Sequence, residues 1–344
     1  MTDRIKGVDV ERVTEWFEAN VADVRGPLSF DLIAGGHSNL TYTVTDATGV
    51  RYVLRRPPLG HVLATAHDMS REHKIISALG PTDVPVAPAL GLCTDDTVNG
   101  APFYVMDFVD GLVLRDGAAA TMISPEARTN ASHSVADTLA RIHAVDPDAV
   151  GLGDLGKKED YIARQLKRWY GQWEKSKTRD LALVDHVHDE LLAKVPEQGP
   201  AAIVHGDYRL DNCMNDHDGN VIAVLDWEIC TLGDPLADVG LLMVYWTEAD
   251  DASPMMQAAA TAQEGFLSRK EVLDRYAEGS DRDLSQIDYY EAFGYWKLAC
   301  IVEGVYARYV GGAMGTTDAA AFEGFKVQVD RCAEAAAEAM GRLG

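Results

Sequence analysis

The sequence lacks a long hydrophobic run and any paired-cysteine motif. No stretch approaches the roughly 20 apolar residues that a membrane-spanning helix requires, and residues 1–7 lack the apolar core of a signal peptide. The five cysteines are scattered and show no Cys-x-x-Cys spacing, which argues against a zinc site and favours a reduced cytosol. We therefore expect a cytoplasmic protein without a membrane partner.

Basic residues are also scarce. The chain has 31 Lys and Arg against 54 Asp and Glu, a formal net charge of −23. Nucleic-acid-binding surfaces are basic, so this balance argues against a nucleic-acid partner, and equally against anionic membrane surfaces. Two interpretations stay open: a solvated acidic surface that favours solubility, or a preference for cationic substrates.

The length and residue patterns predict two lobes of unequal size. With 344 residues, the chain exceeds one typical domain. Residues 1–109 show a helical pattern at 8–24, strand-like runs from 28 to 54, a helix at 70–79 and an apolar strand at 103–109. We expect this part to be a small lobe built on an antiparallel sheet.

Residues 110–344 form the second expected lobe, which is larger and mainly helical. A strand pair at 203–204 and 221–225 interrupts the helices. The predicted fold class is therefore α+β. The expected helices span residues 125–145, 159–175, 181–194, 237–248, 257–277, 285–309 and 318–342.

The most informative segment runs from His205 to Glu228. Its Asp207 follows an apolar strand, Asn212 comes five residues later, and Asp226 ends the apolar run 221–225. The protein-kinase template has this order: an aspartate that accepts the hydroxyl proton, then an asparagine and an aspartate that hold Mg²⁺. Carboxylate and amide oxygens suit Mg²⁺, so the spacing predicts phosphoryl transfer.

Two side chains near these residues have alternative roles, and a third has a single expected one. His205 is either a general base or metal ligand, or a structural residue that orients the loop, and we favour the structural role. Glu228 is either an outer contact of the metal site or a solvated acid. Asp211 is expected to be exposed.

His-Gly-Asp-Tyr-Arg-Leu-Asp-Asn at 205–212, followed by Leu-Asp-Trp-Glu at 225–228, resembles the aminoglycoside phosphotransferase and choline kinase-like family. The resemblance can be followed over most of residues 28–245 and implies a two-lobed protein-kinase-like fold. It also implies Asp207 as catalytic base, Asn212 and Asp226 as Mg²⁺ ligands, and Asp238 as a brace for the catalytic loop. The segment 226–235 is closest to the branch that resembles the kinase-like domain of acyl-CoA dehydrogenase fusion proteins.

The same resemblance places ATP in the first lobe. The turn Gly35-Gly36-His37-Ser38-Asn39 would lay backbone amides over the phosphates, with contacts from Gly35, Gly36, Ser38 and Asn39. Arg55 stands where this strand normally carries a phosphate-pairing lysine, and Arg56 is the competing candidate. Alternation puts Val53 on the same face as Arg55, where it would touch adenine, and Glu72 would pair with Arg55. The structural alternatives are an ordinary hairpin turn for the glycine segment and an exposed helix acid for Glu72.

The segment 103–111 resembles an interlobe hinge, although an apolar strand with aromatic residues is also typical of plain core. Met106 would line the back of the adenine pocket. Backbone groups of Asp107, Phe108 and Val109 would meet the adenine ring.

The substrate is expected to be a small molecule with a hydroxyl group. Only eleven residues separate Asp226 from Asp238, too few for the activation segment with which protein kinases dock peptides. An amino sugar, an amino alcohol and a hydroxyacyl compound remain open as acceptors. Two other functions stay possible: a nucleotide-binding pseudokinase, because Arg55 replaces lysine, and a metal-dependent hydrolase that uses His205, Asp207 and Asp226.

The helices contribute further candidates. Trp169, Tyr170 and Trp173 recur at helical spacing, which favours core packing over a wall of the substrate cleft. His143 lies on an amphipathic helical pattern and is expected to be structural.

Overall fold

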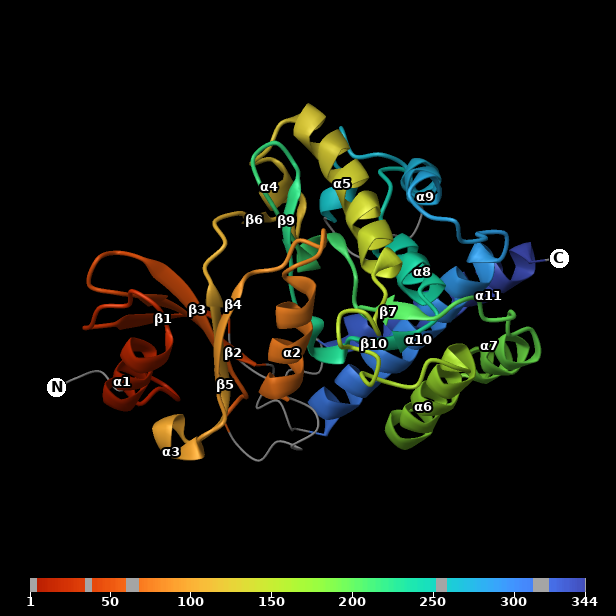
Figure 1. Cartoon of the computed structure of the whole chain (residues 1–344). Helices are drawn as coiled ribbons and strands as arrows, with labels where there is room; N and C mark the ends of the chain where they lie inside the picture. Colours follow the sequence, from red (N-terminus) through yellow and green to blue (C-terminus); the bar gives the residue numbers. More distant parts are fainter. Residues whose placement is uncertain (1–4, 35–38, 60–67, 252–258, 312–321, 344) are drawn as a thin grey trace. The chain divides into compact units, whose positions relative to one another are not determined.

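The structure is a computed structural model that describes residues 5–34, 39–59, 68–251, 259–311 and 322–343 (Figure 1). The chain divides into two compact units. The sheet unit comprises Met1–Gly111 and Ile222–Glu228, and the helical unit comprises Leu112–Val221 and Ile229–Gly344. Asp226 therefore belongs to the sheet unit, although it is far in sequence from the rest of that unit.

An antiparallel five-stranded sheet in the order β1-β2-β3-β5-β4 forms the centre of the sheet unit. Val53 on β3 pairs with Thr43 on β2 and with Met106 on β5. The elements of this unit are α1 (Val10–Asn20), β1 (Ser29–Ala34), β2 (Leu40–Thr45), β3 (Arg51–Arg56), α2 (Met69–Leu79), β4 (Ala89–Cys93), α3 (Asp96–Asn99) and β5 (Phe103–Asp107).

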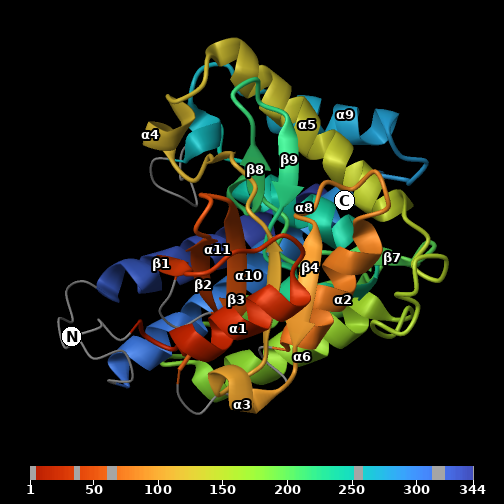
Figure 2. The ribbon, with the colours of Figure 1, turned by 60° about the vertical axis from the view of Figure 1, so that its left-hand side comes forward.

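Helix α1 supplies one side of the sheet unit's core, and Figure 2 shows it in front of the strands. Asp9 caps the start of this helix, since its side chain accepts a hydrogen bond from the Arg12 N–H. Val13 and Phe17 on this helix are fully buried in a cluster that includes Val44 and Leu54 of the sheet. Each such side chain contributes about 1.5–3 kcal/mol through burial, so the core holds β3 in place.

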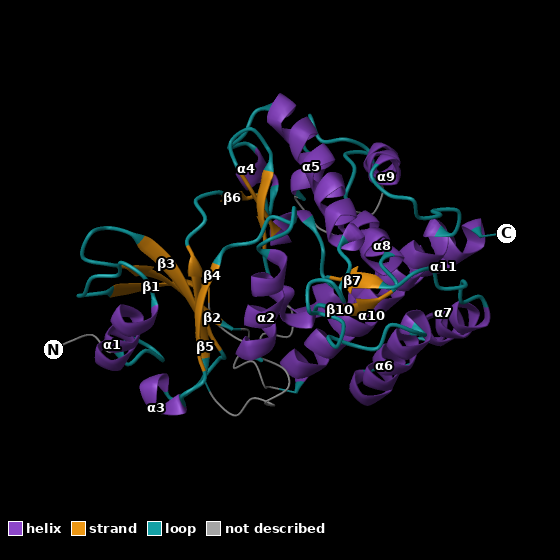
Figure 3. Cartoon of the chain, viewed as in Figure 1, coloured by secondary structure: helices purple, strands orange, loops and turns teal. Residues whose placement is uncertain are grey.

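The helical unit carries most of the helices (Figure 3). Its elements are β6 (Leu112–Val113), α4 (Gly117–Ala120), α5 (Pro125–Ala144), α6 (Tyr161–Ser176), α7 (Ala182–Ala193), β7 (Ala202–Val204), the 3₁₀ turn η1 (Leu210–Asn212), β8 (Cys213–Asn215), β10 (Thr231–Gly233), α8 (Leu236–Tyr245), the 3₁₀ turn η3 (Ala260–Ala262), α9 (Arg269–Glu278), α10 (Ile287–Val310) and α11 (Glu323–Arg342). The strand β9 (Val221–Val224) and the 3₁₀ turn η2 (Trp227–Ile229) lie where the chain passes between the units.

Helix α10 is the buried centre of the helical unit and packs against α6, α7, α8 and α11. Its contact with α8 depends on Gly240, where an added Cβ would come within 2.4 Å of the Tyr290 backbone. Trp296 and Phe293 of α10 are almost fully buried. The predicted α+β class, with a small antiparallel sheet and a larger helical part, is thus confirmed.

Two details of the prediction are wrong. The strand at 203–204 pairs with β10, with Ile203 opposite Leu232, and not with the run 221–225. The helix expected at 257–277 is α9, which begins only at Arg269. Gly265 has a φ of +101°, and the side chain of Ser268 caps the helix together with Glu271, so the helix starts after this point.

No helix in the described parts of the chain is long and apolar enough to cross a membrane.

Candidate active site

The loop that follows β7 is held by a buried carboxylate. Asp238 on α8 accepts hydrogen bonds from the backbone N–H groups of His205, at 2.6 Å, and Gly206, at 2.8 Å. Gly206 has a φ of +86°, and an added Cβ would lie 3.1 Å from the Ile229 side chain. A glycine is therefore required here, and the next residue, Asp207, is fixed in place.

The carboxylate of Asp207 remains partly accessible, with 30% of its side chain exposed. The Asn212 amide donates to its Oδ2 at 2.9 Å and to its backbone oxygen at 2.8 Å. Arg209 Nε lies 3.5 Å from the same carboxylate. This arrangement suits a general base, because an oriented and accessible carboxylate is required to accept a proton.

His205 is fully buried, and its Nδ1 accepts a hydrogen bond from the Asp207 N–H at 3.3 Å. The ring thus orients the loop, which is the structural role that the sequence favours. Asp211 is half-buried and 3.2 Å from Arg209 Nη2, so the expectation that it would be exposed is wrong. Burial raises the pKa of Asp211 above its ordinary value.

In the sheet unit, Arg55 forms ion pairs with three carboxylates. Its Nε lies 3.0 Å from Glu72, and its Nη2 donates to Asp226 Oδ1 at 2.6 Å and lies 3.6 Å from Glu228. The pairing of Arg55 with Glu72 that the sequence predicts is therefore present. Burial alone lowers the pKa of Arg55, but the attraction of Tyr104, Glu72 and Asp226 outweighs it, so the pKa lies above its ordinary value.

Glu72 is held on several sides. Its side chain is 2% exposed, and it accepts hydrogen bonds from the Asn39 amide at 2.9 Å and the Tyr104 hydroxyl at 3.0 Å. Asn39 also donates to Glu228 at 3.2 Å, so Glu228 belongs to this cluster and is not a solvated acid. The Asn39 amide nitrogen is therefore bonded to two carboxylates. Gly35, Gly36 and Ser38 lie outside the described residues.

Arg56 has a different environment from Arg55. Its guanidinium donates to the backbone oxygens of Gly7, Pro57 and Asn99 and is almost fully buried. Arg56 therefore stabilises the sheet unit, and Arg55 is the better candidate for phosphate contact.

The expected adenine contacts lie on neighbouring strands. Val53 is directly opposite Met106 in the sheet. The Asp107 N–H donates to the Pro88 oxygen at 2.9 Å, so that N–H is already used. The guanidinium of Arg51 lies 3.9 Å from the centre of the Phe108 ring. The contact of adenine with the other backbone groups of Asp107, Phe108 and Val109 stays a prediction.

The donor atoms of Asn212 and Asp226 suit Mg²⁺. The Asn212 nitrogen faces Asp207, which leaves the amide oxygen for a metal, and Asp226 uses only Oδ1 toward Arg55 in the hydrogen bond described above. Asp226 has a φ of +62°, a left-handed conformation that aspartate tolerates better than most residues. Among the described residues, no group of three or more His, Cys, Asp or Glu side chains is arranged to bind a metal. Each of the two side chains, one in each unit, has an oxygen of the kind that binds Mg²⁺ alongside phosphates and water.

The model of the phosphotransferase enzyme family matches residues 29–277. The chain belongs to this family. Acyl-CoA dehydrogenase family member 10 of Mus musculus is 33% identical over 300 residues, which are 86% of this chain and 28% of that protein. The chain spans only 28% to 41% of the length of such curated relatives.

Solved structures agree. One from Ralstonia eutropha, provisionally assigned as an aminoglycoside phosphotransferase, is 33% identical with a TM-score of 0.81 and covers 97% of this chain and 98% of its own. Choline kinase of Cryptosporidium parvum has the same fold at 13% identity, with a TM-score of 0.66 and coverage of 97% and 96%. The predicted family resemblance and the two-lobed protein-kinase-like fold are thus confirmed.

Sequence reasoning missed one charged residue that contacts the loop after β7. Lys297, on α10, is buried, and its Nζ donates to the Gly206 oxygen at 3.0 Å. The signal was available, because Lys297 is a single charge within the apolar run 292–302. Nothing in the sequence, however, indicates that α10 contacts the loop that follows β7.

The three aromatic residues singled out on α6 differ in their surroundings. Trp173 is fully buried and donates to Asp185 at 3.2 Å, and Tyr170 stacks on His188 with ring centres 4.0 Å apart. Trp169 is half-buried, and Lys297 Nζ lies 5.7 Å from its ring centre. Trp173 is thus core, as favoured, whereas Trp169 reaches the residues around Asp207.

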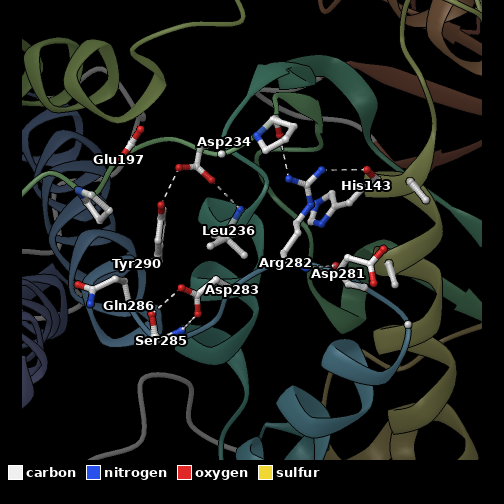
Figure 4. A pocket seen from close by; sticks show the side chains of 17 residues that line it. His143, Glu197, Asp234, Leu236, Asp281, Arg282, Asp283, Ser285, Gln286 and Tyr290 are labelled. Carbon is white, nitrogen blue, oxygen red and sulfur yellow. Dashed lines mark hydrogen bonds between the residues drawn. The ribbon is translucent and has the colours of Figure 1, made fainter.

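A cavity of about 780 Å³ opens elsewhere in the helical unit (Figure 4). Its walls include His143, Asp234, Arg282 and Tyr290. Tyr290 donates to Asp234 at 2.6 Å, and Arg282 donates to the backbone oxygens of Pro200 and His143. Neither Asp207 nor Asn212 lines this cavity, so it is separate from the candidate catalytic groups. His143 is buried and bonded to the Tyr276 hydroxyl at 2.8 Å, in line with the structural role expected for it.

Proposed function

We propose that this protein transfers the terminal phosphate of ATP to a hydroxyl group of a small molecule. The observation that carries this proposal is the exposure and orientation of the Asp207 carboxylate. Its carboxylate is partly exposed, oriented by Asn212, and carried on a loop that Asp238 holds through two backbone N–H groups. Phosphoryl transfer depends mainly on positioning and charge stabilisation, and this loop supplies the positioning.

In the proposed reaction, Asp207 accepts the proton of the acceptor hydroxyl as its oxygen bonds to the γ-phosphorus. The bond from that phosphorus to the bridging oxygen breaks, and ADP leaves with the bonding electrons. Asn212 keeps the Asp207 carboxylate turned toward the hydroxyl through its 2.9 Å hydrogen bond. Bound Mg²⁺ would neutralise charge on the phosphates, with Asn212 and Asp226 as its protein ligands.

The nucleotide would bind to the residues of the sheet unit. Arg55 has a planar guanidinium that suits phosphate oxygens, and its Nε lies 3.0 Å from Glu72. Val53 and Met106 offer an apolar surface for adenine. We assign residues 1–109 as the nucleotide lobe and residues 110–344 as the lobe with the catalytic loop and acceptor pocket.

A small-molecule acceptor is supported by the segment between Asp226 and Asp238. The turn η2 and the strand β10 occupy it, which leaves no room for a peptide-docking segment. Amino sugars, amino alcohols and hydroxyacyl compounds are the acceptor classes to compare. A hydrolase that binds metal through His205 is disfavoured, because that side chain is fully buried and its Nδ1 is bonded to the Asp207 N–H.

Changing Asp207 to Asn tests the proposal. Loss of the general base should lower kcat by about 10²- to 10⁴-fold, while the Kd for ATP with Mg²⁺ stays close to that of the wild type. The matched control is Asp189→Asn on α7, whose carboxylate is 81% exposed and should leave both values unchanged. The measurements are ADP release with an acceptor panel and calorimetric titration of the nucleotide. Near-normal turnover by Asp207→Asn would exclude the assigned base.

A further inference from the structure

Lys297 is a charged side chain in an unusual position. It lies on α10, between the fully buried Trp296 and the largely buried Leu298, and is itself 8% exposed. Burying an ammonium is costly unless its charge and its N–H donors find partners. Such residues cluster at functional sites.

The contacts of Lys297 place its ammonium beside the catalytic loop. Nζ donates to the oxygen of Gly206, the residue directly before Asp207, at 3.0 Å. The face of Trp169 lies 5.7 Å away on another side. An ammonium has three N–H donors, and toward the described residues one of them makes a hydrogen bond.

Two carboxylates near this loop also act on the charge of Lys297. Burial lowers the pKa of its ammonium, and the carboxylates of Asp207 and Asp238 act in the opposite direction. Arg209 adds a second cation near the base, with its Nε 3.5 Å from Asp207 and its guanidinium 4.8 Å from the ring centre of Tyr245. Two cations, Lys297 and Arg209, thus lie near Asp207 in the helical unit, and Arg209 also pairs with Asp211 at 3.2 Å.

The hydrogen bond to the Gly206 oxygen does not by itself require a lysine. A neutral donor would satisfy the Gly206 carbonyl without the cost of a buried charge. The carboxylates of Asp207 and Asp238 favour the positive charge, and the remaining N–H groups can bind an oxygen that arrives with the substrate.

We propose that Lys297 is a specificity-determining residue of the acceptor site, where it binds an oxygen of the acceptor next to the reacting hydroxyl. This inference rests on the proposed phosphotransferase function and narrows its acceptor class. An acceptor with a carboxylate or carbonyl oxygen near the hydroxyl is favoured. An acceptor with an ammonium group there is disfavoured by repulsion between like charges.

Two small alcohols of opposite charge test this inference. We choose 3-hydroxypropanoate and 3-aminopropan-1-ol, because they share chain length and hydroxyl group and differ in the charge at the far end. The wild type should favour the hydroxy acid in kcat/KM for phosphate transfer. Lys297→Met should lower this ratio by roughly ten- to a hundred-fold, the value of one charge-assisted hydrogen bond. Lys297→Arg, which keeps the charge, should restore the preference.

The matched control is Lys326→Met, since Lys326 also lies over an aromatic ring, at 5.4 Å from the centre of Tyr306, but on α11. It should leave the ratio unchanged. If Lys297→Met does not fold, Lys297→Gln replaces it, because glutamine keeps an N–H donor without the charge.

The outcomes separate the two proposals. Phosphate transfer with the same ratio in the wild type and Lys297→Met, or a wild-type preference for the amino alcohol, would overturn the role of Lys297 and leave the phosphotransferase function standing. Binding of ATP with Mg²⁺ but transfer to neither alcohol would also overturn it. Absence of both nucleotide binding and transfer would overturn the proposed function itself.

Discussion

Replacing Asp238 by alanine should destabilise the protein and disable the catalytic loop together. The substitution removes the acceptor of two buried backbone N–H groups, those of His205 at 2.6 Å and Gly206 at 2.8 Å. Each buried donor left without a partner costs about 1–3 kcal/mol, so the expected loss is about 2–6 kcal/mol. Since whole proteins are stable by only about 5–15 kcal/mol, this is a large fraction. Asp238→Asn keeps one acceptor oxygen, and we expect it to lose about half as much.

The assay combines urea unfolding with ADP release at saturating acceptor. The matched control is Asp234→Ala, which also removes a buried carboxylate with two hydrogen bonds, from the Tyr290 hydroxyl and the Leu236 N–H, but does not touch the catalytic loop. Both alanine variants should unfold at lower urea, and only the change at Asp238 should lower turnover by more than about tenfold. Equal unfolding free energies for Asp238→Ala and the wild type, or equal turnover, would refute the bracing role.

The contribution of Asp238 to stability should depend on pH. Burial raises the pKa of Asp238. The hydrogen bonds from His143 and the Gly206 N–H, together with the charges of His143 and His205, outweigh burial, so the pKa lies below its ordinary value. A carboxyl whose pKa is lower in the folded protein contributes its full stability above the unfolded pKa of about 3.9 and loses it as the pH falls through the folded value. The difference in unfolding free energy between the wild type and Asp238→Asn should therefore shrink below about pH 4.

Two further predictions concern the sheet unit. Arg55→Lys should lower kcat/KM for ATP by roughly ten- to a hundred-fold, because a single ammonium does not reproduce the fork that spans Glu72 and Asp226; steady-state kinetics that match the wild type would contradict this. Asp226→Ala should abolish the Mg²⁺ dependence of ATP binding in calorimetric titrations. The control is Asp110→Ala, which removes an 82% exposed partner of Arg51 in the same unit, and unchanged titrations for Asp226→Ala would remove its metal role.

The sequence predicts those parts of the structure that depend on local signals. Helix α5, expected at 125–145, is observed at Pro125–Ala144 because Ser124 caps it and Pro125 suits the first turn. Asp207 and Asn212 are only five residues apart, so the local conformation of the loop is enough to bring them into contact. Helix α9 begins later than the sequence predicts, at Arg269, because Ser268 and Glu271 form a capping box at its start.

Long-range contacts were harder to predict. Lys297 lies 91 residues from Gly206, and periodicity predicts a buried helix without showing which loop it supports. The pairing of β7 with β10 also escaped prediction, since both strands have only three residues. Such short strands are defined by their partners more than by their own residues.

All five native cysteines are buried thiols. Burial raises the pKa of Cys213 and Cys332 to about 12, and a thiol that stays protonated reacts slowly with alkylating reagents. Fluorophores could thus be coupled to two introduced surface cysteines, one in each unit, without first removing the native ones. Energy transfer between the dyes would then report the separation of the units in solution, with and without nucleotide.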